Sequence, residues 1–316
     1  PLQHLYFDNC KTIAIFRIRC TYPYLAPSSI IARPLPFRTQ VSSMLSDSYQ
    51  NRFGGIERLY GTGTLAILRH AHVCVVGIGG VGSWAAEALA RSGIGQITLI
   101  DLDEICVSNT NRQSHAASGQ YGRVKVEVMA ERLRAINPDI QCHPDMDFVT
   151  AANVAEKMAG GYDFVLDATD SVKHKVAMIV YCKRNKIPLY VVGSAGGQTD
   201  PTRIHYADIT RAEQDPLLAL VRKKLRQEHG YSSNLKRRFS IECVYSDEPV
   251  MFQQPDGSVC STRPATHGNS SVRLDCAGGI GASTCVTGSF GFVASSRIIK
   301  KILDKARQSG SSSNTE

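Results

Sequence analysis

Apolar runs and segments of helical period alternate along the middle of the chain. Short, mostly apolar runs that are compatible with buried strands occupy His72 to Val76, Ile97 to Ile100, Phe164 to Leu166 and Pro188 to Val192. Between them, Val126, Met129, Leu133 and Ile136 recur at helical spacing, and Asn137-Pro138 ends that helix. Further helices are expected over about Ser83 to Arg91 and Val172 to Arg184. Strands that alternate with helices predict an α/β fold with a mainly parallel sheet flanked by helices.

The segments on either side of this alternation have different patterns. About Asp47 to Leu68 is expected as a helical lead-in, whereas residues from about 200 to 275 are polar, basic and turn-rich, which favours an insertion or cap. Cys276 to Ala294 is uncharged for 19 residues, but its many Gly, Ser and Thr residues favour a Gly-rich loop and a buried helix over a membrane span. We therefore expect one domain over residues 44–303 and a flexible tail over 304–316.

The first 43 residues differ in composition from the rest of the chain. They mix prolines with basic residues and show no sustained period, whereas Met44 opens a sequence typical of a natural start. We expect a non-native leader or a disordered extension here. The net charge of +8 permits an anionic partner such as RNA, but five of the basic residues lie in this segment, so the remainder is only mildly basic.

The cysteine pattern excludes two kinds of site. The ten cysteines include no C-x-x-C pair, so neither a four-cysteine zinc site nor a thioredoxin-like motif is available. Most of them lie in apolar contexts, which is typical of reduced, core-filling thiols in a cytoplasmic protein.

A glycine-rich loop, Gly77-Ile78-Gly79-Gly80-Val81-Gly82, follows the first predicted strand and precedes a predicted helix. This spacing lets backbone N–H groups approach phosphates closely, and the helix dipole favours their charge. Asp101 ends the second strand, where a carboxylate can accept hydrogen bonds from ribose hydroxyls. The β-loop-α-β order predicts a Rossmann-like sheet. By themselves these features fit an NAD-dependent oxidoreductase as well as an ATP-using enzyme.

Charged motifs that follow the loop favour ATP. They are Asp101-Leu-Asp103, Ser108-Asn109-Thr-Asn111-Arg112-Gln113, Gly122-Arg-Val-Lys125 and Asp167-Ala-Thr-Asp170. Adenylation requires cations over the triphosphate, because negative charge builds on the α-phosphate and on the departing pyrophosphate. Arg112 and Lys125 can supply that charge, and Asp170 can hold Mg²⁺. Such residues are most often solvated surface charges, but both cations occupy motif positions.

These five motifs, in this order, resemble those of the E1-like activating enzymes of the ThiF, MoeB and HesA superfamily. RFGG-x-x-RLYG at Arg52 to Gly61, together with TNRQ and NPDI, resembles the branch that acts on threonylcarbamoyladenosine in tRNA. The resemblance covers nearly all of residues 44–303. It implies an adenylating domain that uses ATP and Mg²⁺.

The resemblance also implies roles for individual residues. Gly79, Gly80 and Gly82 would cradle phosphates, and Asp101 would hold the ribose. Asp103 would also bind the nucleotide, Asn109, Arg112 and Lys125 would line the phosphates, and Asp170 would serve the metal. In the family, an arginine of the lead-in segment reaches across a dimer to the partner's γ-phosphate. Arg58 is the better match and Arg52 the second choice, so a homodimer is expected.

The implied reaction is the ATP-dependent dehydration, by cyclisation, of N6-threonylcarbamoyladenosine next to the anticodon of tRNA. ATP would convert the threonine carboxylate to an acyl-adenylate, and an internal nitrogen or oxygen would then close a ring. AMP and pyrophosphate would be released. Gly278-Gly279-Ile-Gly281 is a candidate for a monovalent cation or for close packing, and we expect no DNA partner.

Three other functions stay open at this point. The substrate of adenylation could be the C-terminal glycine of a ubiquitin-like sulfur carrier, although enzymes of that kind generally have C-x-x-C zinc motifs. An NAD-dependent oxidoreductase would need neither Arg112 nor Lys125. A non-catalytic nucleotide sensor that partners a cysteine desulfurase and sulfur-acceptor system would bind ATP without turnover.

Several residues have two interpretations. Asp167 either enters the site, caps the following helix or orients Asp170. Cys243 is expected in a polar, loop-like setting, where a structural or sulfur-relay role is favoured over acyl transfer because ring closure needs no thioester. The cations from Arg222 to Arg238 form either a solvated face or contacts to tRNA phosphates, with Tyr231 and Phe239 available for base stacking.

Overall fold

The computed structural model describes residues 45–263 and 280–311. The expectations for residues 1–43, and for Gly278 and Gly279 as cation ligands, concern residues outside these ranges. The described part belongs to a unit that spans Val41–Glu316.

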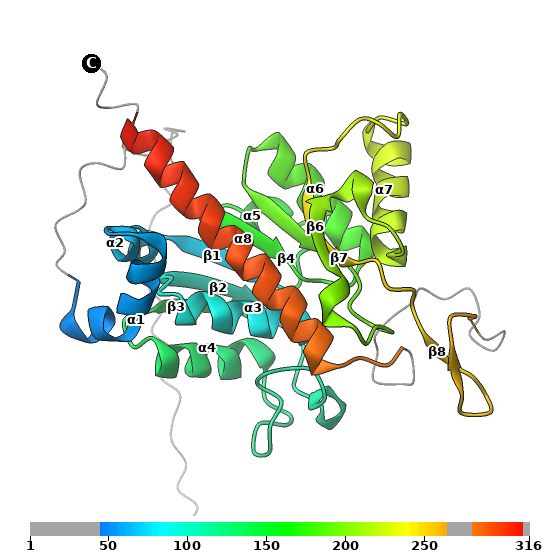
Figure 1. Cartoon of the computed structure of the whole chain (residues 1–316), viewed down its shortest axis with the longest axis horizontal. Coiled ribbons are helices and arrows are strands. Elements are labelled where there is room, and N and C mark those ends of the chain that lie inside the picture. The colour runs from blue at the N-terminus through cyan, green and yellow to red at the C-terminus, as the bar shows by residue number, and fades with distance from the viewer. Residues whose placement is uncertain (1–44, 264–279, 312–316) are drawn as a thin grey trace, which may run out of the picture. The chain divides into compact units, whose positions relative to one another are not determined.

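One seven-stranded sheet forms the centre of the fold, with the strand order β3-β2-β1-β4-β5-β7-β6 (Figure 1). The strands are β1 (His72–Val76), β2 (Gln96–Ile100), β3 (Gln141–Asp145), β4 (Phe164–Asp167), β5 (Leu189–Val192), β6 (Ile204–Asp208) and β7 (Glu242–Ser246). All neighbouring pairs are parallel except β6 and β7, which are antiparallel. The expected mainly parallel sheet is therefore confirmed. Its order reverses between β1 and β4, which is where open α/β sheets bind their ligands.

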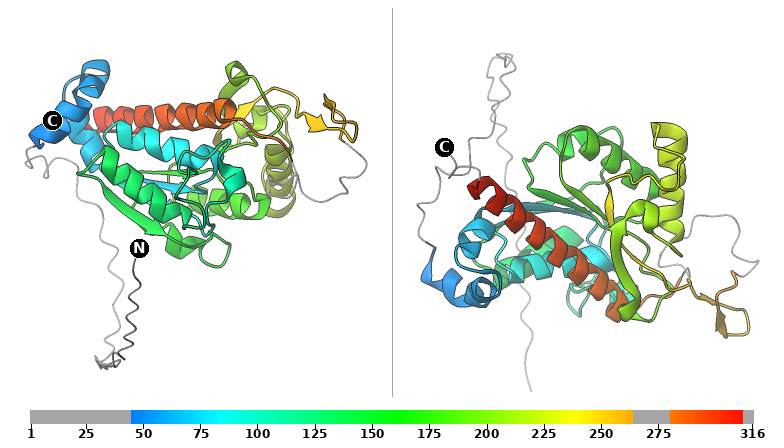
Figure 2. Two further views of the ribbon diagram at one scale, coloured as in Figure 1. Left: turned by 90° about the horizontal axis from the view of Figure 1, so that it is seen from below. Right: turned by 45° about the horizontal axis from the view of Figure 1, so that its top comes forward.

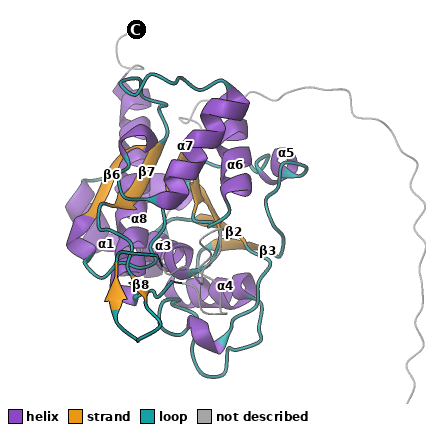
Figure 3. Ribbon diagram, turned by 90° about the vertical axis from the view of Figure 1, so that its right-hand side faces the viewer, coloured by secondary structure: helices purple, strands orange, loops and turns teal. Residues whose placement is uncertain are grey.

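Helices cover both faces of this sheet. They are α1 (Asp47–Tyr60), α2 (Thr64–His70), α3 (Gly80–Arg91), α4 (Lys125–Ile136), α5 (Val154–Lys157), α6 (Val172–Arg184), α7 (Pro216–His229) and α8 (Thr284–Ser311). Side chains of α3, α4 and α8 share one core with Val73 and Val75 of β1, and Cys74 and Val76 belong to a second core with α5 and α6. Because both faces of β1 are buried, its sequence is a continuous apolar run. A third core joins α6 to α7, which lie side by side (Figure 3).

The segment from about 200 to 275, expected as an insertion or cap, contributes β6 and β7 to the main sheet. Ile241, Cys243 and Tyr245 alternate along the chain and are all buried against α6 and α7. The surrounding polar and basic residues hide this short alternation in the sequence. A small hairpin of β8 (Phe252–Gln253) and β9 (Val259–Cys260) is hydrogen-bonded separately from the sheet.

Helix α8 is longer than expected and extends into the predicted tail as far as Ser311. Val286, Phe290, Ala294 and Ile298 repeat every four residues and are buried in the core that includes α3, beside which α8 lies (Figure 2). The buried helix expected after Cys276 is thus present from Thr284 onward. None of the described helices combines the length and the apolar character that a membrane span requires.

Candidate nucleotide-binding site

The loop from Gly77 to Gly82 joins β1 to α3, and glycine is required at both of its ends. Gly77 has φ +88°, and a β-carbon there would lie 2.9 Å from the backbone of Ala168. A β-carbon at Gly82 would lie 1.8 Å from the carbonyl oxygen of Gly77. Gly79, the N-cap of α3, has no atom within 4 Å of its β-carbon position. The loop therefore folds tightly onto itself and leaves open space beside Gly79.

Asp101 fastens this loop to the end of β2. Its Oδ2 accepts a hydrogen bond from the backbone N of Ile78 at 2.6 Å, and its Oδ1 accepts one from the backbone N of Asp103 at 2.9 Å. Burial, which leaves Asp101 9% exposed, raises the pKa of its carboxyl group, and the charge of nearby Lys125 opposes that rise. A carboxylate thus lies at the position where the sequence predicts a ribose contact.

Lys125 begins α4 and is only 6% exposed. Its Nζ donates to Oδ2 of Asp103 at 2.8 Å and lies 4.0 Å from Oδ1 of Asp101. Its backbone N also donates to the carbonyl oxygen of Asp103. The Asp103 side chain is 58% exposed, so an incoming phosphate can compete with it for the ammonium group. The burial of Lys125 is incompatible with its interpretation as an ordinary solvated surface charge.

Arg112 lies against the start of α3. Its carbonyl oxygen accepts hydrogen bonds from Nε1 of Trp84 at 3.0 Å and from Oγ1 of Thr287 at 3.3 Å, so α3 and α8 both fix its backbone. Its Nη1 donates to the carbonyl oxygen of Ser108 and to the side chain of Asn111. A β-carbon at Gly80 would lie 3.4 Å from Cγ of Arg112. The structure therefore brings Arg112 beside the glycine loop.

The buried Asn109 has a structural contact in this structure. Its Oδ1 accepts a hydrogen bond from the backbone N of Cys106 at 3.1 Å and so caps the short 3₁₀ turn Val107–Asn109. This turn positions the start of the segment that carries Arg112. In this structure the oxygen of Asn109 therefore forms a turn, whereas the family resemblance implies a place for this residue at the phosphates.

The two aspartates after β4 have different environments. Asp170 is exposed, whereas Asp167 is fully buried and its Oδ1 accepts hydrogen bonds from the backbone N and Oγ1 of Thr169. The Nζ of Lys175 lies 3.0 Å from the same oxygen and donates to the Asp167 carbonyl. Asp167 thus shapes the turn that leads to Asp170. Sequence reasoning missed Lys175, because a lysine in a helical segment resembles a surface residue.

A magnesium ion would need ligands from outside the protein. Within the described ranges, no group of three His, Cys, Asp or Glu side chains is arranged to hold a metal ion. Mg²⁺ commonly takes one or two carboxylates and fills its remaining positions with phosphate and water oxygens. An exposed carboxylate such as that of Asp170 fits this kind of site.

The two arginines of α1 lie at the end of the sheet opposite to the glycine loop. The hydroxyl group of Tyr49 donates to the carbonyl oxygen of Gly93, just beyond the carboxyl end of α3. Helix α1 is thereby packed at the amino ends of the strands. Arg52 and Arg58 are exposed there, so the structure does not bring them into the site of their own chain.

Cys243 does not lie in a polar loop, contrary to the expectation from sequence. It is a fully buried residue of β7, and burial strongly raises the pKa of its thiol. Its polar neighbours Glu242 and Ser246 are the two ends of the strand. The arrangement supports a core-filling role.

The expectation for the aromatic residues of the basic segment is also wrong in part. Phe239 is only 6% exposed and packs against the half-buried Tyr231, with the guanidinium group of Arg226 above its ring. It is therefore unavailable to a nucleic-acid base. Lys223 and Arg237 remain exposed.

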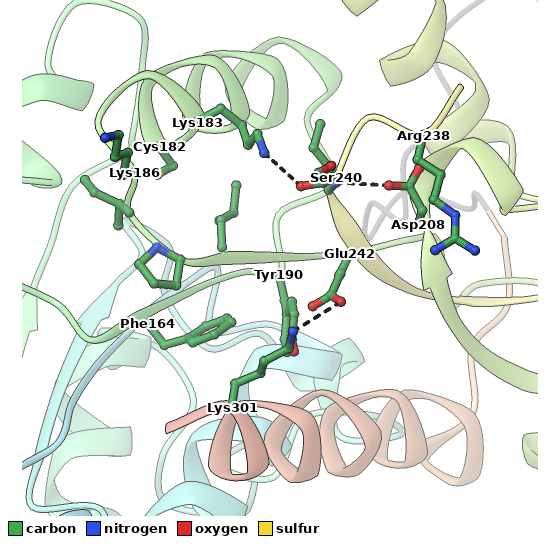
Figure 4. A pocket seen from close by; sticks show the side chains of 14 residues that line it. Phe164, Cys182, Lys183, Lys186, Tyr190, Asp208, Arg238, Ser240, Glu242 and Lys301 are labelled. Carbon is green, nitrogen blue, oxygen red and sulfur yellow. Dashed lines mark hydrogen bonds and ion pairs between the residues drawn. The ribbon is translucent and has the colours of Figure 1, made fainter. Parts of the chain in front are cut away.

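A cavity of about 570 Å³ lies between the sheet, α6 and α8, with Phe164, Tyr190 and Glu242 among its lining residues (Figure 4). Residues at the amino ends of β4, β5 and β7 line it, together with Lys183 and Lys301. Lys183 donates to the carbonyl oxygen of Ser240, and Lys301 lies 3.5 Å from Glu242. This cavity is not part of the nucleotide-binding site.

Comparison with known proteins agrees with the geometry. The sequence pattern of the ThiF family matches residues 54–315. The chain belongs to the ThiF family. The family that the motifs resemble is thus confirmed.

Similar members of the ThiF family share most of this chain. It is 52% identical over 270 residues to the tRNA threonylcarbamoyladenosine dehydratase of Escherichia coli K12, covering 85% of this chain and 100% of that protein. The dehydratase of Haemophilus influenzae is 52% identical over 259 residues, with 82% and 96% covered. A crystal structure of E. coli tRNA N6-threonylcarbamoyladenosine dehydratase, TcdA, in complex with ATP has a TM-score of 0.74 and 48% identity, with 84% and 99% covered.

Substitution of Gly82 tests whether the loop must close on itself. Gly82→Ala is expected to lower the free energy of unfolding by about 2 to 4 kcal/mol, because its β-carbon would overlap the Gly77 carbonyl. Gly79→Ala, where the space is open, should cost no more than about 1 kcal/mol. Chemical denaturation measures both variants. Equal costs would contradict the proposed close approach.

The burial of His115 leads us to expect a specific dependence of the free energy of unfolding on pH. It is buried with neither ring nitrogen hydrogen-bonded, and burial, with help from Lys125 and Arg132, lowers its pKa to about 4. Since its ordinary pKa is 6.5, the unfolded chain takes up the proton first. The stabilisation is complete above pH 6.5 and is lost as the pH falls through 4, by about 3 kcal/mol in total.

The variant His115→Phe should lack this loss, so its stability relative to the unmodified protein should rise on acidification. Urea unfolding at several pH values between 4 and 7.5 measures the difference. The exposed His229 provides a matched control, and His229→Phe should give a curve parallel to that of the unmodified protein. A parallel curve for His115→Phe would show that His115 is protonated without penalty.

Proposed function

We propose that this chain catalyses the ATP-dependent dehydration, by cyclisation, of N6-threonylcarbamoyladenosine in tRNA. The relatives of this name from E. coli and Haemophilus influenzae match it over nearly their whole length, and solved structures of the E. coli protein contain ATP or AMP. The single structural observation that carries the proposal is the buried ammonium group of Lys125 between Asp101 and Asp103. A hydride-transfer site has no use for a cation at that position, whereas an adenylation site requires one.

The residues of the site would divide the work of adenylation. Asp101 would accept hydrogen bonds from the ribose hydroxyls, and Gly79 and Gly80 would leave room for the phosphates beside the start of α3. Lys125 would exchange Asp103 for a phosphate oxygen, and Arg112 would neutralise charge on the departing pyrophosphate. Mg²⁺, held in part by Asp170, would supply further neutralisation of the triphosphate when bound.

The reaction balances without a redox partner. An oxygen of the threonine carboxylate bonds to the α-phosphorus of ATP, and the bond to pyrophosphate breaks. An internal nitrogen or oxygen of the modification then bonds to the activated carbonyl carbon, loses its proton to solvent and displaces AMP. The nucleoside thus loses one water overall, whose oxygen leaves within AMP. Positioning and activation can account for most of the rate, because the nucleophile is already part of the substrate.

We further propose a homodimer in which Arg58 of one chain serves the site of the other. Helix α1 lies at the amino edge of the sheet, so a contact between Arg58 and a γ-phosphate requires a second copy. A monovalent cation, a sulfur-transfer partner and a cytoplasmic location stay predictions.

The dehydration itself can be measured directly. The protein is incubated with ATP, Mg²⁺ and tRNA that contains threonylcarbamoyladenosine, and the released nucleosides are weighed by mass spectrometry. We expect the mass of one water to be lost, and Lys125→Ala and Asp170→Ala to slow this loss by at least about a hundredfold. Lys305→Ala, which removes an exposed lysine from α8, should leave the rate unchanged. Pyrophosphate exchange that depends on a carrier protein's Gly-Gly tail, with no mass change in tRNA, would favour the sulfur-carrier alternative.

Mixed dimers test the proposed role of Arg58. Arg58→Ala and Lys125→Ala should each be nearly inactive alone, because every site in each dimer lacks one group. After subunit exchange in an equal mixture, half of the dimers would contain one intact site, which should restore about a quarter of the full activity. The same experiment with Arg52→Ala shows whether Arg52 is the arginine in question. A mixture that stays inactive after confirmed exchange would contradict a contribution across the dimer.

A further inference from the structure

Gln198 is a buried amide that no other described residue satisfies. It is 2% exposed, and neither its Oε1 nor its Nε2 has a hydrogen-bond partner. Each buried polar group left without a partner costs about 1 to 3 kcal/mol. A leucine of similar size would avoid this cost, so the amide is more useful with a ligand than without one.

The backbone around Gln198 is held firmly on both sides. The preceding residue, Gly197, donates its N–H to the carbonyl oxygen of Gly281 at 2.7 Å and accepts a hydrogen bond from the N of Met251 at 2.8 Å. The following residue, Thr199, donates its N–H and hydroxyl group to the carboxylate of Glu248. The amide is thus attached to a preorganised backbone, as a recognition residue should be.

The same contacts connect Gln198 to the phosphate side of the site. Gly281, which contacts Gly197, is followed by Ala282, whose carbonyl oxygen accepts a hydrogen bond from Nδ2 of Asn111 at 2.8 Å. Asn111 precedes Arg112 in the chain. Gln198 therefore lies in a hydrogen-bonded assembly that includes the backbone next to the candidate phosphate-binding arginine.

Gln198 follows a different half of the sheet from the residues assigned to the ribose and the glycine loop. Asp101 and the glycine loop follow β2 and β1, whereas Gln198 lies in the segment after β5, the strand that pairs with β4. In open sheets of this kind, ligands bind across the crevice outside the carboxyl ends of the strands, where the strand order reverses, which is here between β1 and β4. The chemical group that reaches Gln198 should consequently belong to the substrate.

We propose that Gln198 recognises the ureido group of the threonylcarbamoyl modification. A ureido group presents N–H donors beside a carbonyl acceptor, and a glutamine amide presents the complementary acceptor and donor. Oε1 would accept from a ureido N–H and Nε2 would donate to the ureido carbonyl. This assignment rests on the proposed function, and it makes Gln198 a specificity residue for the acyl half of the reaction.

The test compares Gln198→Leu with the unmodified protein. Removal of the unsatisfied amide should leave thermal stability and ATP affinity unchanged or higher, while kcat/KM for the modified tRNA falls about tenfold to a hundredfold. Gln198→Glu, which keeps an acceptor and loses the donor, should show a partial loss. A packing role alone would instead lower stability and ATP affinity together, and this result would overturn the proposal.

A second substrate identifies the group that is recognised. In tRNA with glycylcarbamoyladenosine the ureido group is present and the threonine hydroxyl is absent, so Gln198→Leu should lower kcat/KM for both tRNAs by the same factor. A loss confined to the threonyl substrate would mean that the amide contacts the hydroxyl group, and the proposal would be wrong. If the unmodified protein dehydrates neither tRNA, the proposed function fails. If it dehydrates the threonyl substrate and Gln198→Leu does so equally well, only the role of Gln198 fails.

Discussion

The carboxylate of Asp101 connects the parts of the site to one another. One of its oxygens holds the backbone of Ile78 inside the glycine loop, and the other holds Asp103, whose side chain is the partner of Lys125. The loop, the end of β2 and the start of α4 are thus joined through a single buried side chain. Burial raises the pKa of Asp101, and Lys125 favours its ionised form. Loss of this carboxylate would therefore release both the loop and the cation.

A second buried network supports the other half of the sheet. The Asp167–Lys175 pair is fully buried below the turn that leads to Asp170. Asp215, the N-cap of α7, accepts a hydrogen bond from Ser194 in the loop after β5, and burial raises the pKa of Asp215 to about 6. These carboxylates hold loops that would carry ligand-binding groups while they remain inaccessible to the ligand themselves. The polar residues thus divide into groups that hold backbone and groups that face the site.

The sequence predicts the strands that helices cover on both faces and misses a strand that is mostly exposed at the edge of the sheet. Strand β1 is apolar at nearly every position because helices cover both of its faces. Strand β3 at the sheet edge has one buried residue, Cys142, and its sequence has no strand pattern. The role of Lys175 was missed because the sequence alone does not distinguish a buried lysine from an exposed one. The motif positions of Arg112 and Lys125 indicated their location near the site, because phosphate chemistry restricts which residues can occupy such positions. The setting of Cys243 was predicted wrongly, because the polar residues at the two ends of β7 resemble a loop in the sequence.

The unsatisfied polar groups of the described residues point to the same edge of the sheet as the motifs do. The buried side-chain atoms without partners belong to Gln113, His115, Asp167 and Gln198. Gln113 and His115 lie in the segment between β2 and α4, Asp167 is the last residue of β4, and Gln198 lies in the segment after β5. A protein tolerates such local costs where a ligand or a reaction requires them and removes them elsewhere. Apart from Asp167, whose carboxylate is held by Lys175, these costs favour a ligand site that extends from the β2 side of the sheet to the loop after β5.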